Sequence, residues 1–301
     1  MKVRVLGSAA GGGFPQWNCG CGNCQAARRG EAGVRARTQE SIAVSGDGQS
    51  WLLVNASPEI RAQIESFEGL WPRGDRHSPI AGLALTNGDL DHCLGLLSLR
   101  ESHPLTVYAS EAVRAGFTAG NVLYRTLERF EGQVTWRRLE LGREQPIAGA
   151  GLAVTALPAP GKLPLHLEGV RAASPEDNVG LVIRDVRSGS RLAYLSGVSG
   201  PSAEVERAVT GAAAVFFDGT FWSSDELIAA GLGTRRAEDM AHWPISGSGG
   251  SLEFLARLRA RRRIFIHVNN TNPILREGSP ARAEIERRGL EVAVDGMEVE
   301  L

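Results

Sequence analysis

A strand that ends in a cluster of polar side chains constrains this sequence more than any other feature. Residues 80–85 alternate as a buried strand, and an apolar helical pattern begins after His92. The turn between them holds Asn87, Asp89, Asp91 and His92. Any one of these residues alone is more simply explained as a helix cap, a packed side chain or a solvated one. Together, three ionisable groups within four residues repel one another unless a cation or a substrate compensates, so the sequence predicts a binding site here.

Composition and charge exclude several classes of protein. The chain has 301 residues, of which 43% are hydrophobic and 22% charged, which is typical of a soluble globular enzyme and excludes a largely disordered chain. The formal net charge of -1 gives no electrostatic reason to expect binding to nucleic acid or to an anionic membrane. No apolar run approaches the roughly 18 residues of a membrane span, and the first residues lack a signal peptide. We therefore expect a cytoplasmic protein without an integral membrane segment.

Three of the four cysteines lie within six residues, at Cys19, Cys21 and Cys24. In a chain without a secretory signal this spacing favours metal binding over disulfides. The glycines between the cysteines let the backbone curl, so that three thiolates converge on one tetrahedral ion, which we expect to be zinc, with a distant fourth ligand. The alternative is a set of reduced surface thiols. Cys93 is interpreted as a small buried residue and not as the fourth ligand.

Strands and helices alternate along the whole chain. Ser57 is the predicted N-cap of a short helix over residues 59–67, and Ser110 of a later one. A loop over residues 158–177 contains His166, and loops of this length are usually functional lids or disordered. The predicted elements match two layers of sheet flanked by helices, with strands over 38–44, 50–54, 80–85, 105–109, 152–157, 179–183, 192–195, 212–217 and 264–267.

Two later strands also end in side chains that can bind a metal. Asp218 follows the strand 212–217, and His267 closes the strand that begins at Ile264. His242 lies between two glycine-bearing loops. Asp218 alone would be interpreted as structural. If these strand ends share one sheet edge with Asp91 and His92, however, their side chains can converge on one metal ion.

These motifs resemble the metallo-β-lactamase superfamily. More narrowly, VLGSAAGGGFPQWNCGCGNC, NASPEIRAQ, DGTFW and HVNNTNPIL are similar to the coenzyme PQQ synthesis protein B family, and the resemblance covers the chain from Val3 to Leu301. It implies an α/β fold, a four-layer αββα sandwich of two similar halves. The whole chain, residues 1–301, would be a single domain with a zinc-binding loop at residues 19–24.

The sequence departs from the superfamily at its metal-binding turn. The superfamily pattern is His-x-His-x-Asp-His, and the aligned residues here are Asn87, Asp89, Asp91 and His92. Loss of both leading histidines leaves more oxygen donors, which favours iron or manganese over a dizinc hydrolase centre. His92 and His267, with one carboxylate, approximate the two-histidine, one-carboxylate site of non-haem Fe(II) oxygenases. The expected active-site ligands are Asp89, Asp91, His92, Asp218 and His267, around Fe(II) or, alternatively, zinc or manganese.

The function that the resemblance implies is a step of pyrroloquinoline quinone (PQQ) biosynthesis. The family is similar in role to a hydroxylase that uses O₂ to convert the tyrosine ring of a crosslinked Glu-Tyr diamino acid, cut from a precursor peptide, into a catechol. The candidate site residues are His242 and Asp91 as catalytic groups, Asn87, Arg235, Arg236 and Asn272 for the substrate, and Asn270 for the cysteine zinc or the site wall. A solvated surface pair is an equally good interpretation of Arg235 and Arg236.

Two other functions stay open. The first is a soluble carrier that binds PQQ or its precursor and assists its transport to the periplasm. The second is a metal-dependent hydrolase, which predicts two zinc ions besides the one bound by cysteine. Partners would be a small-molecule substrate and other enzymes of PQQ biosynthesis, with no nucleic acid. The sequence leaves the oligomeric state open, a homodimer included.

Overall fold

Two seven-stranded sheets form the centre of the protein in the computed structural model, which describes residues 1–301. The first sheet has the order β14-β1-β2-β3-β4-β5-β6, with β1 (Lys2–Gly7), β2 (Ser41–Ser45), β3 (Trp51–Val54), β4 (Ile80–Ala84), β5 (Leu105–Ala109), β6 (Val134–Arg138) and β14 (Glu298–Glu300). The second has the order β13-β12-β11-β10-β9-β8-β7, with β7 (Glu144–Ile147), β8 (Leu152–Pro158), β9 (Val179–Asp185), β10 (Arg191–Leu195), β11 (Ala214–Asp218), β12 (Arg262–Ile266) and β13 (Glu291–Val292).

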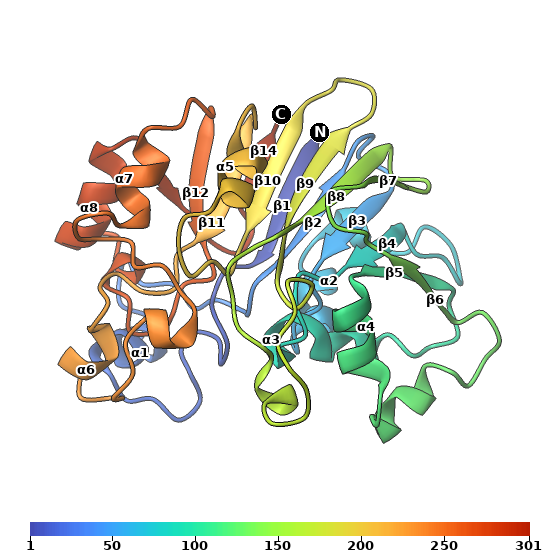
Figure 1. The fold of residues 1–301 in the computed structure, drawn as a ribbon, viewed down its shortest axis with the longest axis horizontal. Coiled ribbons are helices and arrows are strands. Elements are labelled where there is room, and N and C mark those ends of the chain that lie inside the picture. Colours follow the sequence, from blue (N-terminus) through green and yellow to red (C-terminus); the bar gives the residue numbers. More distant parts are fainter.

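Short helices connect the strands and cover the sheets (Figure 1). The α-helices are α1 (Gly22–Arg28), α2 (Ile60–Glu65), α3 (Leu90–Cys93), α4 (Glu111–Thr118), α5 (Ala203–Val209), α6 (Glu226–Ala229), α7 (Ser251–Ala256) and α8 (Pro280–Arg287). The 3₁₀ helices are η1 (Glu68–Leu70), η2 (Leu94–Ser98), η3 (Val122–Thr126), η4 (Leu165–Leu167), η5 (Glu238–Met240) and η6 (Pro273–Leu275). No helix combines the length and the apolar character needed to cross a membrane.

Side chains that alternate along the strands of each sheet are buried in different hydrophobic cores. On β1, Val5 packs into the core between the sheets and Leu6 into the core under the helices of the first half. On β11, Phe216 packs between the sheets and Phe217 under the helices of the second half. This period of two gives each sheet two buried faces, so that helices must cover both outer faces. The result is the predicted four-layer αββα sandwich, with α7 and α8 outside the second sheet (Figure 1).

The direction of the strands brings the candidate site together. Strands β3 to β6 run parallel in the first sheet, and β10 to β13 run parallel in the second. Residues that follow the carboxyl ends of β4, β11 and β12 line the same cavity. Ligands generally bind beyond the carboxyl ends of strands in α/β sheets, and this is where the polar strand ends lie here.

Most predicted elements are present, with different boundaries at their ends. The predicted strand 80–85 is β4, and Ser110 does cap α4, where its side chain accepts a hydrogen bond from the backbone N–H of Val113. The prediction for Ser57 was wrong. Its hydroxyl accepts a hydrogen bond from the backbone N–H of Glu59 in a turn, and α2 begins only at Ile60. A side chain that satisfies a turn before the helix is not available to cap the helix itself.

Candidate active site

Two histidines from opposite halves of the chain face each other at the base of the cavity. His92 lies in α3, just after β4, and His267 directly follows β12. Their Nε2 atoms lie 3.2 Å apart, and the Oδ2 atom of Asp91 is 3.2 Å from Nε2 of His267 and 3.5 Å from Nε2 of His92. Two imidazole lone pairs this close repel each other unless a proton or a metal ion lies between them. The group offers two nitrogens and one oxygen to a single position.

His267 adopts an uncommon backbone conformation, with φ of +60°. Histidine tolerates this left-handed region better than most residues, but such conformations persist mainly where the surrounding structure holds them. The Oγ1 atom of Thr220 lies 2.8 Å from Nδ1 of His267 and 3.0 Å from the backbone oxygen of His267. Thr220 therefore fixes the ring, and Nε2 of His267 is directed at His92 and Asp91.

A second group shares His267 and adds His242 and Asp218. Nδ1 of His242 lies 2.7 Å from Oδ2 of Asp218, and the rings of His242 and His267 are stacked with their centres 5.4 Å apart. Asp218 also accepts hydrogen bonds from the backbone N–H groups of Val198 and Thr220 and from the Thr220 hydroxyl. Both carboxylate oxygens are thus fully used within the protein. In this arrangement Asp218 orients His242, and binding a metal would require it to give up one of these contacts.

Two residues that contact the Nδ1 side of His92 were not predicted from the sequence. The Nδ2 atom of Asn55 lies 2.8 Å from Nδ1 of His92 and donates to Oε2 of Glu40, which is itself 3.6 Å from Nδ1. Glu40 is completely buried, and its Oε1 atom has no hydrogen-bond partner. Histidines that bind metals usually contact such a group through their second nitrogen. One signal was available, because Glu40 is a charged residue directly before a strand that is buried along its whole length.

Neighbouring charges shift the pKa values of His92, Asp91 and Asp218 toward the ionised forms. Burial alone would lower the pKa of His92, but the negative charges of Asp91 and Glu40 outweigh burial and raise it to about 9. Burial would raise the pKa of Asp91, but the charge of His92 and a hydrogen bond to His267 hold it well below its usual range. The pKa of Asp218 is lowered in the same way, since the charge of His242 outweighs burial. Each imidazole therefore has a compensating carboxylate.

The cavity over these residues has a volume of about 440 Å³. Asn87 and Asp89 lie on its wall, and the apolar side chains of Phe221 and Met240 line it as well. The backbone N–H of Asp89 is bonded to the side chain of Asn87, and Asp89 holds the N-cap position of α3 without capping it through its side chain. A cavity of this size accommodates a small organic molecule.

Three of the residues predicted to bind substrate lie away from this cavity or inside the protein core. Arg235 and Arg236 are exposed and do not line it. Asn272 is completely buried, and its amide donates to the backbone oxygens of Gly219 and Thr220. The substrate role predicted for these three residues therefore stays a prediction without a contact in the cavity. Asn87 and His242 do line it.

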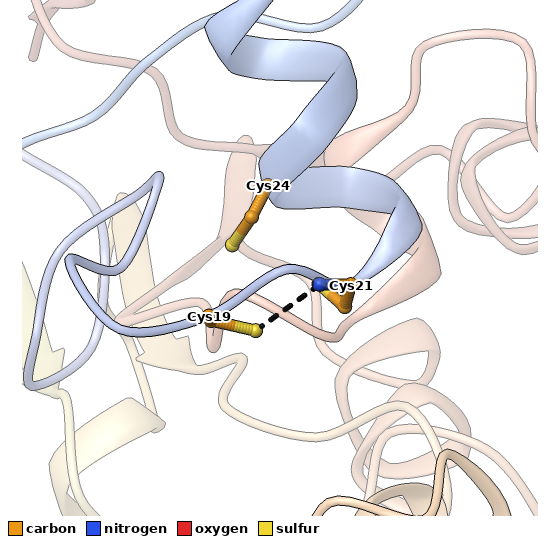
Figure 2. A group of neighbouring side chains, drawn as sticks. All are labelled: Cys19, Cys21 and Cys24. Carbon is orange, nitrogen blue, oxygen red and sulfur yellow. Dashed lines mark hydrogen bonds between the residues drawn. The ribbon is translucent and has the colours of Figure 1, made fainter.

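The three cysteines form a separate cluster beside α1. Figure 2 shows Cys19 on the preceding loop, Cys21 at the start of the helix and Cys24 in its first turn, with the N–H of Cys21 donating to Sγ of Cys19 at 3.4 Å. The three sulfur atoms lie within 4.8 Å of one another. Burial raises the pKa of Cys24 to about 11, whereas hydrogen bonds to Cys24 and Cys19 outweigh burial and lower the pKa of Cys21. Cys93 is buried elsewhere, as predicted.

Asn270 lies at the open side of this cluster. Its Nδ2 atom is 3.1 Å from Sγ of Cys19 and 3.4 Å from Sγ of Cys24. Rotating the amide by half a turn would place its oxygen at the same position. Three sulfurs and one amide oxygen then suit a tetrahedral zinc ion. Asn270 is three residues beyond His267, so one short segment carries a residue of each group.

The donor atoms of both groups fit metal ions. Thiolates select soft or borderline ions such as zinc, and the mixed imidazole and carboxylate set suits zinc, iron or manganese. The unpaired oxygen of Glu40 and the facing nitrogens of His92 and His267 are costly features without a cation. The fold and these donors indicate a metal-dependent protein.

Comparisons with known proteins show the family and the fold of the chain. The family described as beta-lactamase superfamily domain matches residues 50–268. The chain is 43% identical over 303 residues to coenzyme PQQ synthesis protein B of Pseudomonas fluorescens (strain Pf0-1) and 44% identical to that of Azotobacter vinelandii, each match covering 100% of both chains. The structure is similar to zinc-bound PqqB from Methylobacterium extorquens, with 44% identity, a TM-score of 0.94 and full coverage of both chains. A diphosphatase of the PhnP family, at 22% identity and a TM-score of 0.68 over 100% of this chain and 97% of its own, shares the fold.

Proposed function

The chain belongs to the coenzyme PQQ synthesis protein B family of the metallo-β-lactamase superfamily and has a role in PQQ biosynthesis, and we propose that its step is an iron- and O₂-dependent hydroxylation. The substrate is the crosslinked Glu-Tyr precursor, and the site of attack is its tyrosine ring. The observation that carries this proposal is the group formed by Asp91, His92 and His267, in which two imidazoles and one carboxylate face one position. This donor set is the one used by non-haem Fe(II) oxygenases.

The departure from the superfamily pattern supports the same reaction. Asn87 and Asp89 occupy positions at which the superfamily has histidines, and Asn87 is bonded to Asp89 and Asn178 instead of facing the other donors. A hydrolase with two metal ions needs donors for both ions and an activated hydroxide between them. Asp218, whose oxygens are fully bonded within the protein, offers little to a second ion. One active-site ion is therefore the better fit.

The reaction balances with one molecule of O₂ and a two-electron donor. One oxygen atom enters the ring as a hydroxyl group, and the other leaves as water after taking up two protons and two electrons. When bound, iron(II) supplies the one-electron chemistry that lets O₂ react with an aromatic ring. The protein positions the ring against the apolar wall formed by Phe221 and Met240.

His242 is the group best placed to move a proton. Its Nδ1 atom faces the carboxylate of Asp218, which fixes the orientation of the ring. Its other nitrogen, Nε2, is then available to a substrate, because His242 lines the cavity. Loss of the ring hydrogen and ionisation of the phenol both need such a base. We assign this role to His242, with Asp218 as the residue that positions it.

The proposed metal content is one iron ion in the cavity and one zinc ion held by Cys19, Cys21, Cys24 and Asn270. Zinc or manganese is the alternative in the cavity, and the relative from M. extorquens is described as zinc-bound. Zinc has no accessible redox change, so a zinc-loaded cavity binds substrate without oxidising it. Metal analysis of protein purified without oxygen would identify the ion.

The decisive test is a single turnover with labelled oxygen. Protein loaded anaerobically with Fe(II) is mixed with the crosslinked Glu-Tyr compound, a reductant and ¹⁸O₂, and the product is analysed by mass spectrometry. The proposal predicts one labelled oxygen atom in the ring, and none in a matched sample of zinc-loaded protein. Unlabelled product in the iron-loaded sample would overturn it. Tight PQQ binding that survives His92→Ala would then favour a carrier, and two cavity zinc ions would favour a hydrolase.

A further inference from the structure

The loop formed by residues 159–178 covers one side of the active-site cavity and is fixed at its base. It connects β8 to β9 and lies below α3 in Figure 1. The amide of Asn178 donates to the backbone oxygens of Ala159 and Gly197, which ties the two ends of the loop together. A Cβ atom at Gly161 would lie 2.5 Å from Nδ2 of Asn178, so only glycine lets the chain pass this close. The first residues of the loop therefore have a defined position.

The outer part of the loop is also attached to the body of the protein. Ser110 donates to the backbone oxygen of Glu176, and the N–H of Glu111 donates to the Glu176 carboxylate, so the loop is joined to the start of α4. Pro164 packs against the metal-binding turn, where a Cβ atom at Gly88 would lie 3.2 Å from its Cγ. Contacts at both ends thus hold the segment between Gly161 and Pro164 at the edge of the cavity.

Lys162 lies in this held segment and is the only lysine or arginine that lines the cavity. Among 33 basic residues the sequence has only two lysines, Lys2 and Lys162. The two acidic residues that line an adjoining pocket together with Lys162 are engaged elsewhere. Asp177 pairs with Arg171, and Glu204 pairs with Arg207. The ammonium group of Lys162 is therefore an exposed cation at the cavity without a carboxylate partner in the protein.

The charges of the cavity wall are arranged for a ligand that carries both signs. Lys162 contributes a positive charge from the loop, and Asp89 contributes a negative charge from the turn before α3. Lysine is a mobile, strongly hydrated point charge on a long flexible chain, so it can reach a carboxylate of a ligand without a fixed geometry. Amino acids and their crosslinked derivatives carry such a carboxylate together with an ammonium group.

We propose that Lys162 binds a carboxylate of the substrate and so selects amino-acid-derived compounds for the cavity. This inference rests on the proposed function for the identity of the substrate, but not for the reaction. In this role Lys162 determines specificity and has no part in the chemical step. Its removal should weaken substrate binding and leave turnover at saturating substrate nearly unchanged.

The test measures binding to full-length zinc-loaded protein, in which no turnover occurs. The probes are the crosslinked Glu-Tyr compound and its fully methyl-esterified form, titrated by calorimetry into wild type, Lys162→Met, Lys162→Arg and the remote control Lys2→Met. We expect Lys162→Met to weaken binding of the free acid by about tenfold or more. Lys162→Arg and Lys2→Met should bind it within about threefold of wild type, and wild type and Lys162→Met should bind the ester equally.

Three outcomes would overturn the inference. The first is equal binding of the free acid by wild type and Lys162→Met. The second is a parallel loss for acid and ester, which would indicate a general disturbance of the loop. The third is no binding of the free acid to wild type. The labelled-oxygen experiment is independent of these results. If no label is incorporated but binding still depends on Lys162, the hydroxylation proposal fails and the carboxylate site stands.

Discussion

The Nε2 atoms of His92 and His267 lie 3.2 Å apart, although the residues are separated by 175 positions in the sequence. Each ring is held from behind, His92 by Asn55 and Thr86 and His267 by Thr220. The rings cannot turn away from each other without losing these contacts. The two halves of the sandwich therefore present their nitrogens to one shared position, which is the geometry of a metal site spanning both halves.

His92→Ala should abolish metal binding in the cavity. Removal of one of three donors is expected to lower the affinity for the cavity ion by at least about a hundredfold, more than the loss of a supporting contact would. Elemental analysis of wild type should find one cavity ion in addition to the cysteine-bound zinc, and the variant should retain only the latter. His103→Ala, which removes an exposed histidine outside the cavity, is the control. A variant with unchanged metal content would contradict the assignment.

Glu40→Gln should weaken binding of the metal ion in the cavity without unfolding the protein. Glutamine keeps the shape and an acceptor for the amide of Asn55, but it removes the negative charge behind His92. We expect the metal affinity to fall by roughly 10 to 100-fold, as for other supporting carboxylates. Metal-free protein should be as stable as wild type or more stable, because burial opposes the charged form of Glu40 and raises its pKa.

A competition titration with a coloured chelator measures the affinity, and denaturant unfolding of metal-free protein measures the stability. The exposed residue Glu65 offers the control Glu65→Gln, for which neither quantity should change. If Glu40→Gln binds metal as tightly as wild type, the carboxylate does not support His92.

The sequence was sufficient to predict the αββα fold and most of the strand ends that form the site. Asp91, His92 and His267 could be found because each lies at a strand end, which is a local signal. Glu40 gave only the weak signal of a charge directly before a fully buried strand, and Asn55 gave none, because their role depends on contacts with His92, 52 and 37 positions away respectively. The distance from the cavity to Arg235 and Arg236 likewise depends on how a long connection folds, and composition does not determine that.

Cys24→Ser should remove the zinc bound outside the cavity. Zinc binding stabilises the folded state directly, since the three sulfurs converge only when residues 19–24 and Asn270 are in place. We expect the loss of one zinc ion per chain and a decrease of at least about 2 kcal/mol in the free energy of unfolding. Cys93→Ala is the control, and this variant should keep the zinc bound by the three other cysteines, because Cys93 lies in a different core. Unchanged zinc content in Cys24→Ser would refute the site.

Glu226→Gln should change how the stability depends on pH. Glu226 is buried in α6, where its carboxylate accepts hydrogen bonds from the Thr271 hydroxyl and from the backbone N–H of Trp222 at 2.6 Å. Burial outweighs these bonds and raises its pKa from 4.5 to about 7. The folded state therefore holds a proton that the unfolded chain releases at lower pH. The stability that this proton contributes is complete below about pH 4.5 and is lost as the pH rises through 7.

This pKa shift corresponds to a loss of about 3 kcal/mol in the free energy of unfolding between low pH, where Glu226 is protonated in both states, and high pH, where it is ionised in both, because each pKa unit is worth about 1.4 kcal/mol. Glutamine does not titrate, so the free energy of unfolding of wild type minus that of Glu226→Gln should fall by up to this amount between pH 4.5 and pH 8. Denaturant unfolding of both proteins at a series of pH values measures this difference, and the exposed Glu128→Gln should show no such trend. A difference that stays constant or rises with pH would mean that Glu226 is ionised in the folded protein at pH values where we expect it to be protonated.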